Sequence, residues 1–105
     1  MRITTILLAM PLLLMAVPTL AADGPELYRQ NCVKCHGDTG HADSWRGYLY
    51  FARNFTKSKW QAANTDEDII EAINRGPRIM PSFRDKLTVE EKQAVLKVIR
   101  DFGKP

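Results

Sequence analysis

The chain has 105 residues, of which 45% are hydrophobic and 26% are charged, and it contains only two cysteines. With 15 Lys and Arg against 12 Asp and Glu, its net charge is +3. This excess is too weak to indicate nucleic-acid binding, and charges of both signs are mixed along the chain. No repeat or low-complexity segment is visible, so the composition favours a single globular domain.

Residues 1–22 have the layout of a secretory signal peptide. Arg2 supplies a positive start, an apolar run follows, and small residues end the segment. The apolar run is well short of the roughly 20 residues of a membrane-spanning helix. We therefore expect cleavage after Ala21 or Ala22, which leaves residues 23–105 as a periplasmic domain without stable membrane insertion.

A domain of this size buries little surface on folding and often needs a disulfide, a metal or a large cofactor. Its first helix is predicted to open at Gly24 and Pro25, because proline is favoured at the start of a helix. Tyr28, Cys32 and Cys35 then follow at i, i+4 and i+7. The two cysteine sulfurs are therefore expected on one face of this helix.

The sequence C-x-x-C-H, formed by Cys32, Cys35 and His36, allows four interpretations. A disulfide would close only a tiny loop and stabilise little. A thioredoxin-like pair would follow a strand, and none is predicted here. A zinc site needs four ligands, for which only His41 remains. The pattern is typical of c-type haem attachment, in which each thiol adds to one vinyl group and the histidine binds the iron.

The long segment 37–64 is predicted to be a loop with one helical turn near 57–62. Loops of this length are uncommon in small domains unless they wrap a ligand. A second helix should begin after the N-cap Thr65, with three acidic residues in its first turn, and end at Gly76.

Met80 lies in a second irregular stretch, 76–87. A low-spin haem electron carrier needs a sixth iron ligand, usually Met or His. Once the signal peptide is removed, Met80 is the only methionine left. His41 follows His36 too closely to reach the opposite haem face. We therefore predict Met80 as the second axial ligand.

The third helix has the clearest pattern. Thr88 and Glu91 form a capping box, and Val95, Val98, Ile99 and Phe102 then follow helical spacing until Gly103. These four apolar residues are expected to form one stripe that faces the core.

Taken together, these motifs resemble the class I c-type cytochromes over essentially the whole mature chain. The residues that carry the resemblance are Gly24, Tyr28 and Cys32 in the first helix, Gly76, Met80, Pro81 and Phe83 in the distal loop, and Ile99 and Phe102 in the last helix.

The resemblance implies an all-α cytochrome c fold, with three main helices around one covalently bound haem c and with crossing N- and C-terminal helices. It also implies that the Trp60 indole N–H bonds a haem propionate. Mitochondrial members orient the haem histidine with a proline carbonyl, but this chain has no proline between Pro25 and Pro77. The acceptor for His36 should instead be a backbone carbonyl within 37–55.

The expected function is that of a soluble monohaem electron carrier rather than an enzyme, with outer-sphere transfer and a positive midpoint potential. A haem enzyme or small-gas binder with a displaceable Met80 is the main alternative, in which Arg78 would be a distal group. The second alternative is a thiol oxidoreductase that uses Cys32 and Cys35.

Cations around Met80 are expected to dock an acidic redox partner near the haem edge. They are Arg75, Arg78, Arg84 and Lys86. The protein itself is expected to be a monomer.

Overall fold

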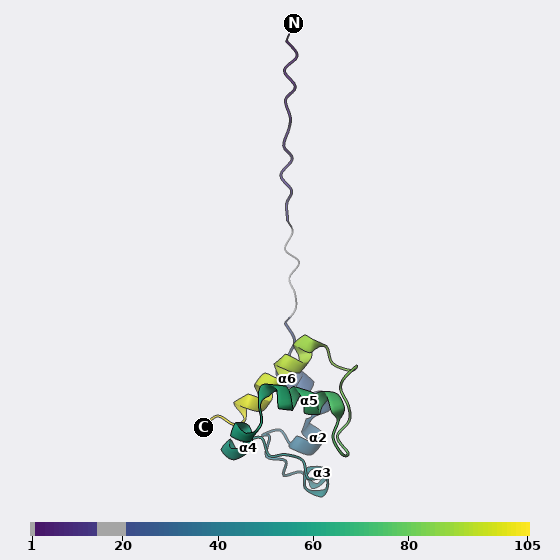
Figure 1. The fold of residues 1–105 in the computed structure, drawn as a ribbon, viewed down its shortest axis with the longest axis vertical. Helices are drawn as coiled ribbons and strands as arrows, with labels where there is room; N and C mark the ends of the chain where they lie inside the picture. The colour runs from purple at the N-terminus through teal and green to yellow at the C-terminus, as the bar shows by residue number, and fades with distance from the viewer. Residues whose placement is uncertain (1, 15–20) are drawn as a thin grey trace.

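The structure, a computed structural model, describes residues 2–14 and 21–105, and every regular element in these ranges is an α-helix (Figure 1). The helices are α1 (Gly24–Asn31), α2 (Val33–His36), α3 (Trp45–Leu49), α4 (Ser58–Ala63), α5 (Asp66–Arg75) and α6 (Val89–Asp101). The expected all-α fold is therefore confirmed.

Residues 2–14 form no helix or strand, and their large apolar side chains are exposed. Residues 15–20 of the predicted signal sequence, which include Thr19 near the expected cleavage site, lie outside the described residues. None of the helices in the described ranges has the length and apolar character needed to span a bilayer. The signal peptide remains a prediction.

The first predicted helix is divided into α1 and α2. Asp23 caps α1 by accepting a hydrogen bond from the Glu26 N–H at 3.2 Å. Cys32 then departs from helical geometry, with φ −120° and ψ −30°. Its N–H still donates to the Tyr28 carbonyl at 2.8 Å, and its own carbonyl accepts from His36 at 3.0 Å. The helical direction therefore continues across the break.

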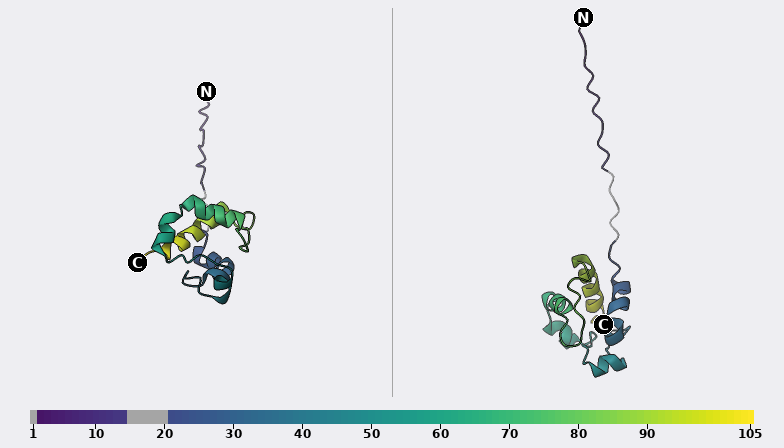
Figure 2. Two further views of the ribbon diagram at one scale, coloured as in Figure 1. Left: turned by 60° about the horizontal axis from the view of Figure 1, so that its bottom comes forward. Right: turned by 90° about the vertical axis from the view of Figure 1, so that its right-hand side faces the viewer.

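The N- and C-terminal helices cross at Gly24, as the resemblance implied, and Figure 2 shows α1 lying beside α6. A Cβ atom on Gly24 would lie 2.5 Å from the Ala94 carbonyl oxygen and 3.2 Å from Val98. One turn further along, the rings of Tyr28 and Phe102 pack with centroids 5.1 Å apart. Glycine therefore permits the close approach of the two backbones.

Capping boxes start the two longer C-terminal helices. In α5 the Thr65 hydroxyl and the Asp68 carboxylate satisfy each other's backbone N–H groups, and Thr88 and Glu91 do the same for α6. Helix α5 ends at Gly76 in the left-handed conformation. The predicted starts of both helices are confirmed, and α6 ends at Asp101, two residues before Gly103.

The core lies between α1, α5 and α6 and continues into the loops. Its buried apolar residues are Tyr28, Phe55, Ile69, Ile73, Phe83, Leu87, Val95, Leu96 and Ile99. Val98 and Phe102, predicted as part of the α6 stripe, are half-buried at its edge.

Candidate haem-binding site

A groove opens beside this core and is lined by members of three segments, 31–36, 50–53 and 77–83. It contains about 950 Å³ of space, part of which is open to solvent. Most of the lining is apolar.

The groove brings together four of the five predicted site residues. Cys32, Cys35 and His36 line it from α2 and its N-cap, and Met80 lines it from the loop between α5 and α6. Met80 is half-buried and also packs against the core. Two sulfur nucleophiles, an imidazole and a thioether therefore face one largely apolar space, although 44 residues separate His36 from Met80 in the chain.

Both cysteines are free thiols in this structure. Burial, and secondarily the neighbouring Cys35, raises the pKa of the Cys32 thiol to about 11. Redox-active thiols instead have lowered pKa values, because the thiolate is the reactive form. The environment of Cys32 therefore gives no support to the thiol oxidoreductase alternative.

A zinc site gains no support either. Within 2–14 and 21–105, no three His, Cys, Asp or Glu side chains are grouped closely enough to hold a metal. His41, the one additional ligand that zinc could have used, is exposed, and its Nδ1 is 2.7 Å from the Thr39 hydroxyl.

The His36 ring is oriented by a backbone carbonyl. Its Nδ1 lies 3.0 Å from the carbonyl oxygen of Arg53. Because a carbonyl can only accept, Nδ1 carries the proton and Nε2 is the nitrogen available to a metal. Burial lowers the pKa of His36, which favours the neutral form that a metal requires. The acceptor predicted within 37–55 is therefore the Arg53 carbonyl.

Phe55 supports the same ring from its face. The centroids of the Phe55 and His36 rings are 4.3 Å apart, with 17° between the ring planes. Phe55 is buried, and its N–H donates to the Gly40 carbonyl at 2.8 Å. The segment 53–55 therefore contacts the imidazole both at Nδ1 and across its face.

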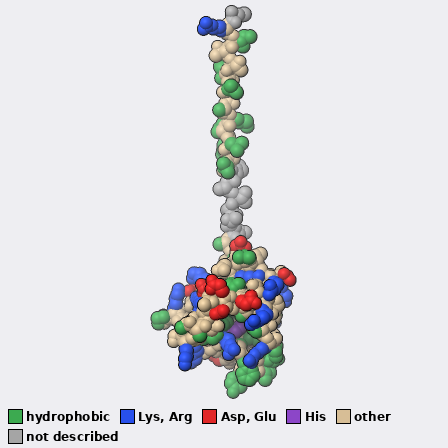
Figure 3. Space-filling model, viewed as in Figure 1, with side chains coloured by type: hydrophobic (Ala, Val, Ile, Leu, Met, Phe, Trp, Pro, Cys, Tyr) green, Lys and Arg blue, Asp and Glu red, His purple; other side chains and the backbone are tan. Residues whose placement is uncertain are grey.

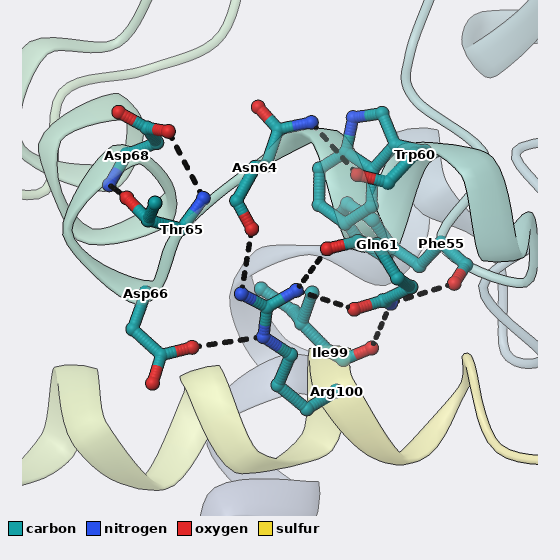
Figure 4. Close-up of polar contacts among 9 residues, drawn as sticks. All are labelled: Phe55, Trp60, Gln61, Asn64, Thr65, Asp66, Asp68, Ile99 and Arg100. Carbon is teal, nitrogen blue, oxygen red and sulfur yellow. Dashed lines mark hydrogen bonds and ion pairs between the residues drawn. The ribbon is translucent and has the colours of Figure 1, made fainter.

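A polar network ties this segment to α6 (Figure 4). The Gln61 amide nitrogen donates to the carbonyls of Phe55 and Ile99, at 2.8 and 2.9 Å. Arg100 in turn donates to both the carbonyl and side-chain oxygens of Gln61, and to the carbonyl of Asn64. The loop that positions His36 is therefore anchored to the C-terminal helix.

The loop that carries Met80 is held at several points. The Phe83 N–H donates to the Ile73 carbonyl at 2.9 Å, and the Ser82 hydroxyl donates to the Asn74 carbonyl. The Lys92 ammonium, on a side chain that is largely buried in α6, donates to the Arg84 carbonyl at 2.9 Å. These bonds attach the loop to both α5 and α6.

Trp60, the fifth predicted site residue, does not line the groove. It is half-buried and packs against Phe55, with ring centroids 5.0 Å apart. In this position it supports the Phe55 ring behind His36. Its hydrogen bond to a propionate remains a prediction.

The chemistry of the groove fits a covalently attached haem. The thiols of Cys32 and Cys35 lie one helical turn apart on its wall, the adjacent imidazole presents a free nitrogen, and a soft thioether lines the same space. A largely apolar groove suits a large planar apolar ring.

Comparison with known families gives a consistent result. The family model described as "Cytochrome C oxidase, cbb3-type, subunit III" matches residues 19–97.

Curated proteins with similar sequences include a subunit of a cbb3-type cytochrome c oxidase, the cytochrome c subunit of a cytochrome bc1 complex, and a cytochrome c6. The chain is 30% identical over 84 residues to the cbb3-type cytochrome c oxidase subunit FixP of Bradyrhizobium diazoefficiens, covering 79% of the chain and 28% of that protein. It is 31% identical to the cytochrome bc1 complex cytochrome c subunit of Corynebacterium diphtheriae, of which it covers 27%. The chain thus spans little more than a quarter of these two relatives. Cytochrome c6 of Leptolyngbya boryana is 28% identical, with 77% of the chain and 91% of that protein covered.

A similar solved structure is that of the KustC0563 c-type cytochrome. It shares 46% sequence identity with this chain and superposes with a TM-score of 0.71. The alignment covers 78% of this chain and 99% of that protein.

Proposed function

The chain belongs to the cytochrome c family whose model is described as cytochrome c oxidase, cbb3-type, subunit III, and we propose that it is a monohaem electron carrier with iron bound by His36 and Met80. Membership of this family implies a covalent haem c, and Cys32, Cys35 and His36 fit its C-x-x-C-H motif. The observation that supports the axial ligands is that His36 and Met80 line one groove with the two cysteines.

A haem held there supplies reversible one-electron chemistry at iron, with thioether bonds from Cys32 and Cys35. The residues of this chain adjust that chemistry in two ways. The Met80 thioether is a soft ligand that favours ferrous iron, and the apolar groove disfavours the extra charge of ferric iron. Both effects raise the midpoint potential, so we expect it to be positive.

Two measurements test this proposal. Protein matured through its native export pathway should show, by intact mass, one haem attached, and its reduced spectrum in alkaline pyridine should show two saturated vinyl groups. Met80→His should retain the haem and lower the midpoint potential, because imidazole favours ferric iron more than a thioether does. A bare polypeptide would refute the haem, and an unchanged potential in Met80→His would refute the ligand assignment.

A haem enzyme or small-gas binder is the second candidate, and one observation favours considering it. Arg78 lines the groove two residues from Met80, with a left-handed φ of +58°, which is uncommon for a residue other than glycine. If Met80 were easily displaced, Arg78 could act as a distal group. Fast, tight binding of carbon monoxide or cyanide would support this candidate, whereas a thioether-to-iron charge-transfer band would support the carrier.

We also propose that the carrier is an exported, periplasmic monomer that meets acidic redox partners. The cations predicted for docking are all exposed, and in the described part of the chain none of them is in an ion pair. They are Arg75, Arg78, Arg84 and Lys86. Electron transfer to such a partner should slow as ionic strength rises.

A further inference from the structure

Helix α3 exposes its large apolar side chains and buries only a glycine, which is the reverse of an ordinary surface helix. Its buried face is a glycine, Gly47, where an added Cβ would collide with the carbonyl oxygen of Cys35 and lie 2.6 Å from that of Ala42. Its outer face carries Trp45, Tyr48 and Leu49, which are 66%, 85% and 56% exposed. Surface helices normally bury such residues and expose polar ones.

Phe51 extends this exposed surface just beyond the helix. It also lines the haem-binding groove and has a φ of +56°, which is a strained conformation for a bulky residue. Together, Trp45, Tyr48, Leu49 and Phe51 form what we call the 45–51 patch. Figure 3 shows hydrophobic side chains gathered at the end of the domain where Figure 1 places α3. Contiguous apolar surface of this kind marks interaction sites.

The 45–51 patch borders the haem-binding groove. Phe51 belongs to both, and α3 packs on α2, which carries Cys35 and His36. The Ser44 hydroxyl, at the N-cap of α3, donates to the Lys34 carbonyl at 3.0 Å. A partner seated on the patch would therefore lie next to the group that exchanges electrons.

Within residues 43–53, which include the patch, Arg46 and Arg53 outnumber the single acid, Asp43. Three exposed cations, Lys34, Arg53 and Arg78, line the groove, and no Asp or Glu does. Arg46, within α3, is held over the Trp45 ring, with its guanidinium carbon 4.6 Å from the ring centroid. The surface therefore combines an aromatic centre with a cationic border, which is complementary to an apolar spot surrounded by carboxylates.

We propose that the 45–51 patch is the docking surface for an acidic redox protein whose own apolar redox edge is surrounded by carboxylates. This inference rests on the proposed electron-carrier function and specifies the partner of that site. Arg46 and Arg53 belong to the same segment as the patch, so they should contribute more to docking than Arg75, Arg84 and Lys86, which lie on α5 and in the loop before α6.

Two other occupants fit the observations less well. A second copy of the chain would bring Arg46, Arg53 and Lys34 against identical cations, which opposes association. An anionic membrane would attract the same charges, but α3 has only five residues, too few for the long amphipathic helix that typically lies in a membrane surface. An acidic protein satisfies both the aromatic and the cationic parts of the surface.

The test uses the haem-loaded protein and reduced flavodoxin, an acidic protein with an exposed flavin edge, as the probe. The double variant Trp45→Ser/Tyr48→Ser changes two residues that do not line the groove. We expect its second-order reduction rate by flavodoxin to fall about tenfold, since aromatic anchors contribute most of the binding energy at interfaces. Its reduction rate by ascorbate, a small reductant, should be unchanged. The matched control is Val89→Ser, which changes a residue on α6 that is 68% exposed, and both rates should stay the same.

Three outcomes would overturn the docking proposal. One is a flavodoxin rate in the double variant within twofold of the wild type. The second is a wild-type dimer in sedimentation that the double variant abolishes. The third is binding to phosphatidylglycerol vesicles that is lost in the double variant while the flavodoxin rate is retained. Failure of the electron-carrier proposal is distinguishable, because it would appear earlier, as a wild-type protein without covalent haem or without a reversible redox couple.

Discussion

The Phe55 ring stacks on the His36 imidazole, with 4.3 Å between the ring centroids. The Arg53 carbonyl, two residues before Phe55, accepts a hydrogen bond from the Nδ1–H of the same imidazole. One contact fixes the tilt of the imidazole and the other fixes its tautomer. The ring is therefore oriented by protein atoms alone, and Nε2 points away from both contacts. Such outer contacts normally position a metal-binding histidine and adjust its basicity.

Replacing Phe55 by leucine should loosen this orientation without emptying the core. Leucine fills much of the same volume but cannot stack on the imidazole. We expect a loss of about 1–3 kcal/mol in the free energy of unfolding, together with changed electron paramagnetic resonance g-values of the ferric haem. Phe102→Leu is the matched control, because the Phe102 ring packs on Tyr28 and Phe55 but makes no ring contact with His36. It should reduce stability with unchanged g-values. If the g-values of Phe55→Leu were the same as those of the wild type, as expected for Phe102→Leu, the stacking would not orient the ligand.

Arg100 should be the most important polar side chain for stability. It is 27% exposed and donates four hydrogen bonds, to Gln61, Asn64 and Asp66. Arg100→Met would leave the acceptor oxygens of Gln61 and Asn64 without their donor. We therefore expect the free energy of unfolding, measured with urea, to fall by about 2–4 kcal/mol. Lys97→Met on the same helix removes only an exposed pair with Asp101 and should cost less than about 1 kcal/mol. Equal losses in the two variants would contradict a special role for the network.

Local sequence signals predicted much of this fold. The helix starts at Thr65 and Thr88 were identifiable because capping boxes depend on residue identity at short spacings. The helix crossing at Gly24 was implied by the resemblance to class I c-type cytochromes. Cys32, Cys35 and Met80, which line the groove, could be singled out because few other side chains supply thiol and thioether groups.

Other features of the site could not be predicted. Any residue can supply a backbone carbonyl, so nothing in the sequence distinguishes Arg53 as the acceptor for His36. Helix α3 has only five residues with a glycine at their centre, which gives no helical apolar pattern. The bond between Arg100 and Gln61 joins residues 39 positions apart, and no local pattern reports such a contact.

Gly24→Ala tests how tightly α1 and α6 are packed. The new methyl group would lie 2.5 Å from the Ala94 carbonyl oxygen, and backbone cannot move as easily as a side chain. Although alanine is the better helix former by about 1 kcal/mol, we expect overpacking to lower the free energy of unfolding by a net amount of about 1–3 kcal/mol. Gln30→Ala, at an exposed position in α1, should change the midpoint of urea unfolding little. A Gly24→Ala variant as stable as the wild type would show that accommodating the methyl group costs no more than the gain of about 1 kcal/mol in helix propensity.

Tyr28 should make the stability of the protein sensitive to alkaline pH. The side chain is only 3% exposed, and its hydroxyl donates to the Gly37 carbonyl at 2.7 Å. Burial, followed by the negative charges of Cys32 and Asp38, raises the pKa of Tyr28 well above its usual value of about 10. The Cys32 contribution disappears when that sulfur forms a thioether, but burial remains. Above pH 10 the unfolded chain releases this proton while the folded chain retains it, so folding stability falls by up to about 1.4 kcal/mol per pH unit until the folded pKa is reached.

Comparing Tyr28→Phe with the wild type isolates this effect. At pH 7 the variant should be less stable by about 1 kcal/mol, because the bond to the Gly37 carbonyl is lost. Since phenylalanine has no proton to release, the variant should lose less stability between pH 10 and 11, and the two unfolding curves should converge. Tyr48→Phe changes a side chain that is 85% exposed, and its stability difference from the wild type should stay near zero at every pH. A gap between wild type and Tyr28→Phe that stays constant from pH 7 to 11 would mean that the folded and unfolded chains bind this proton equally well.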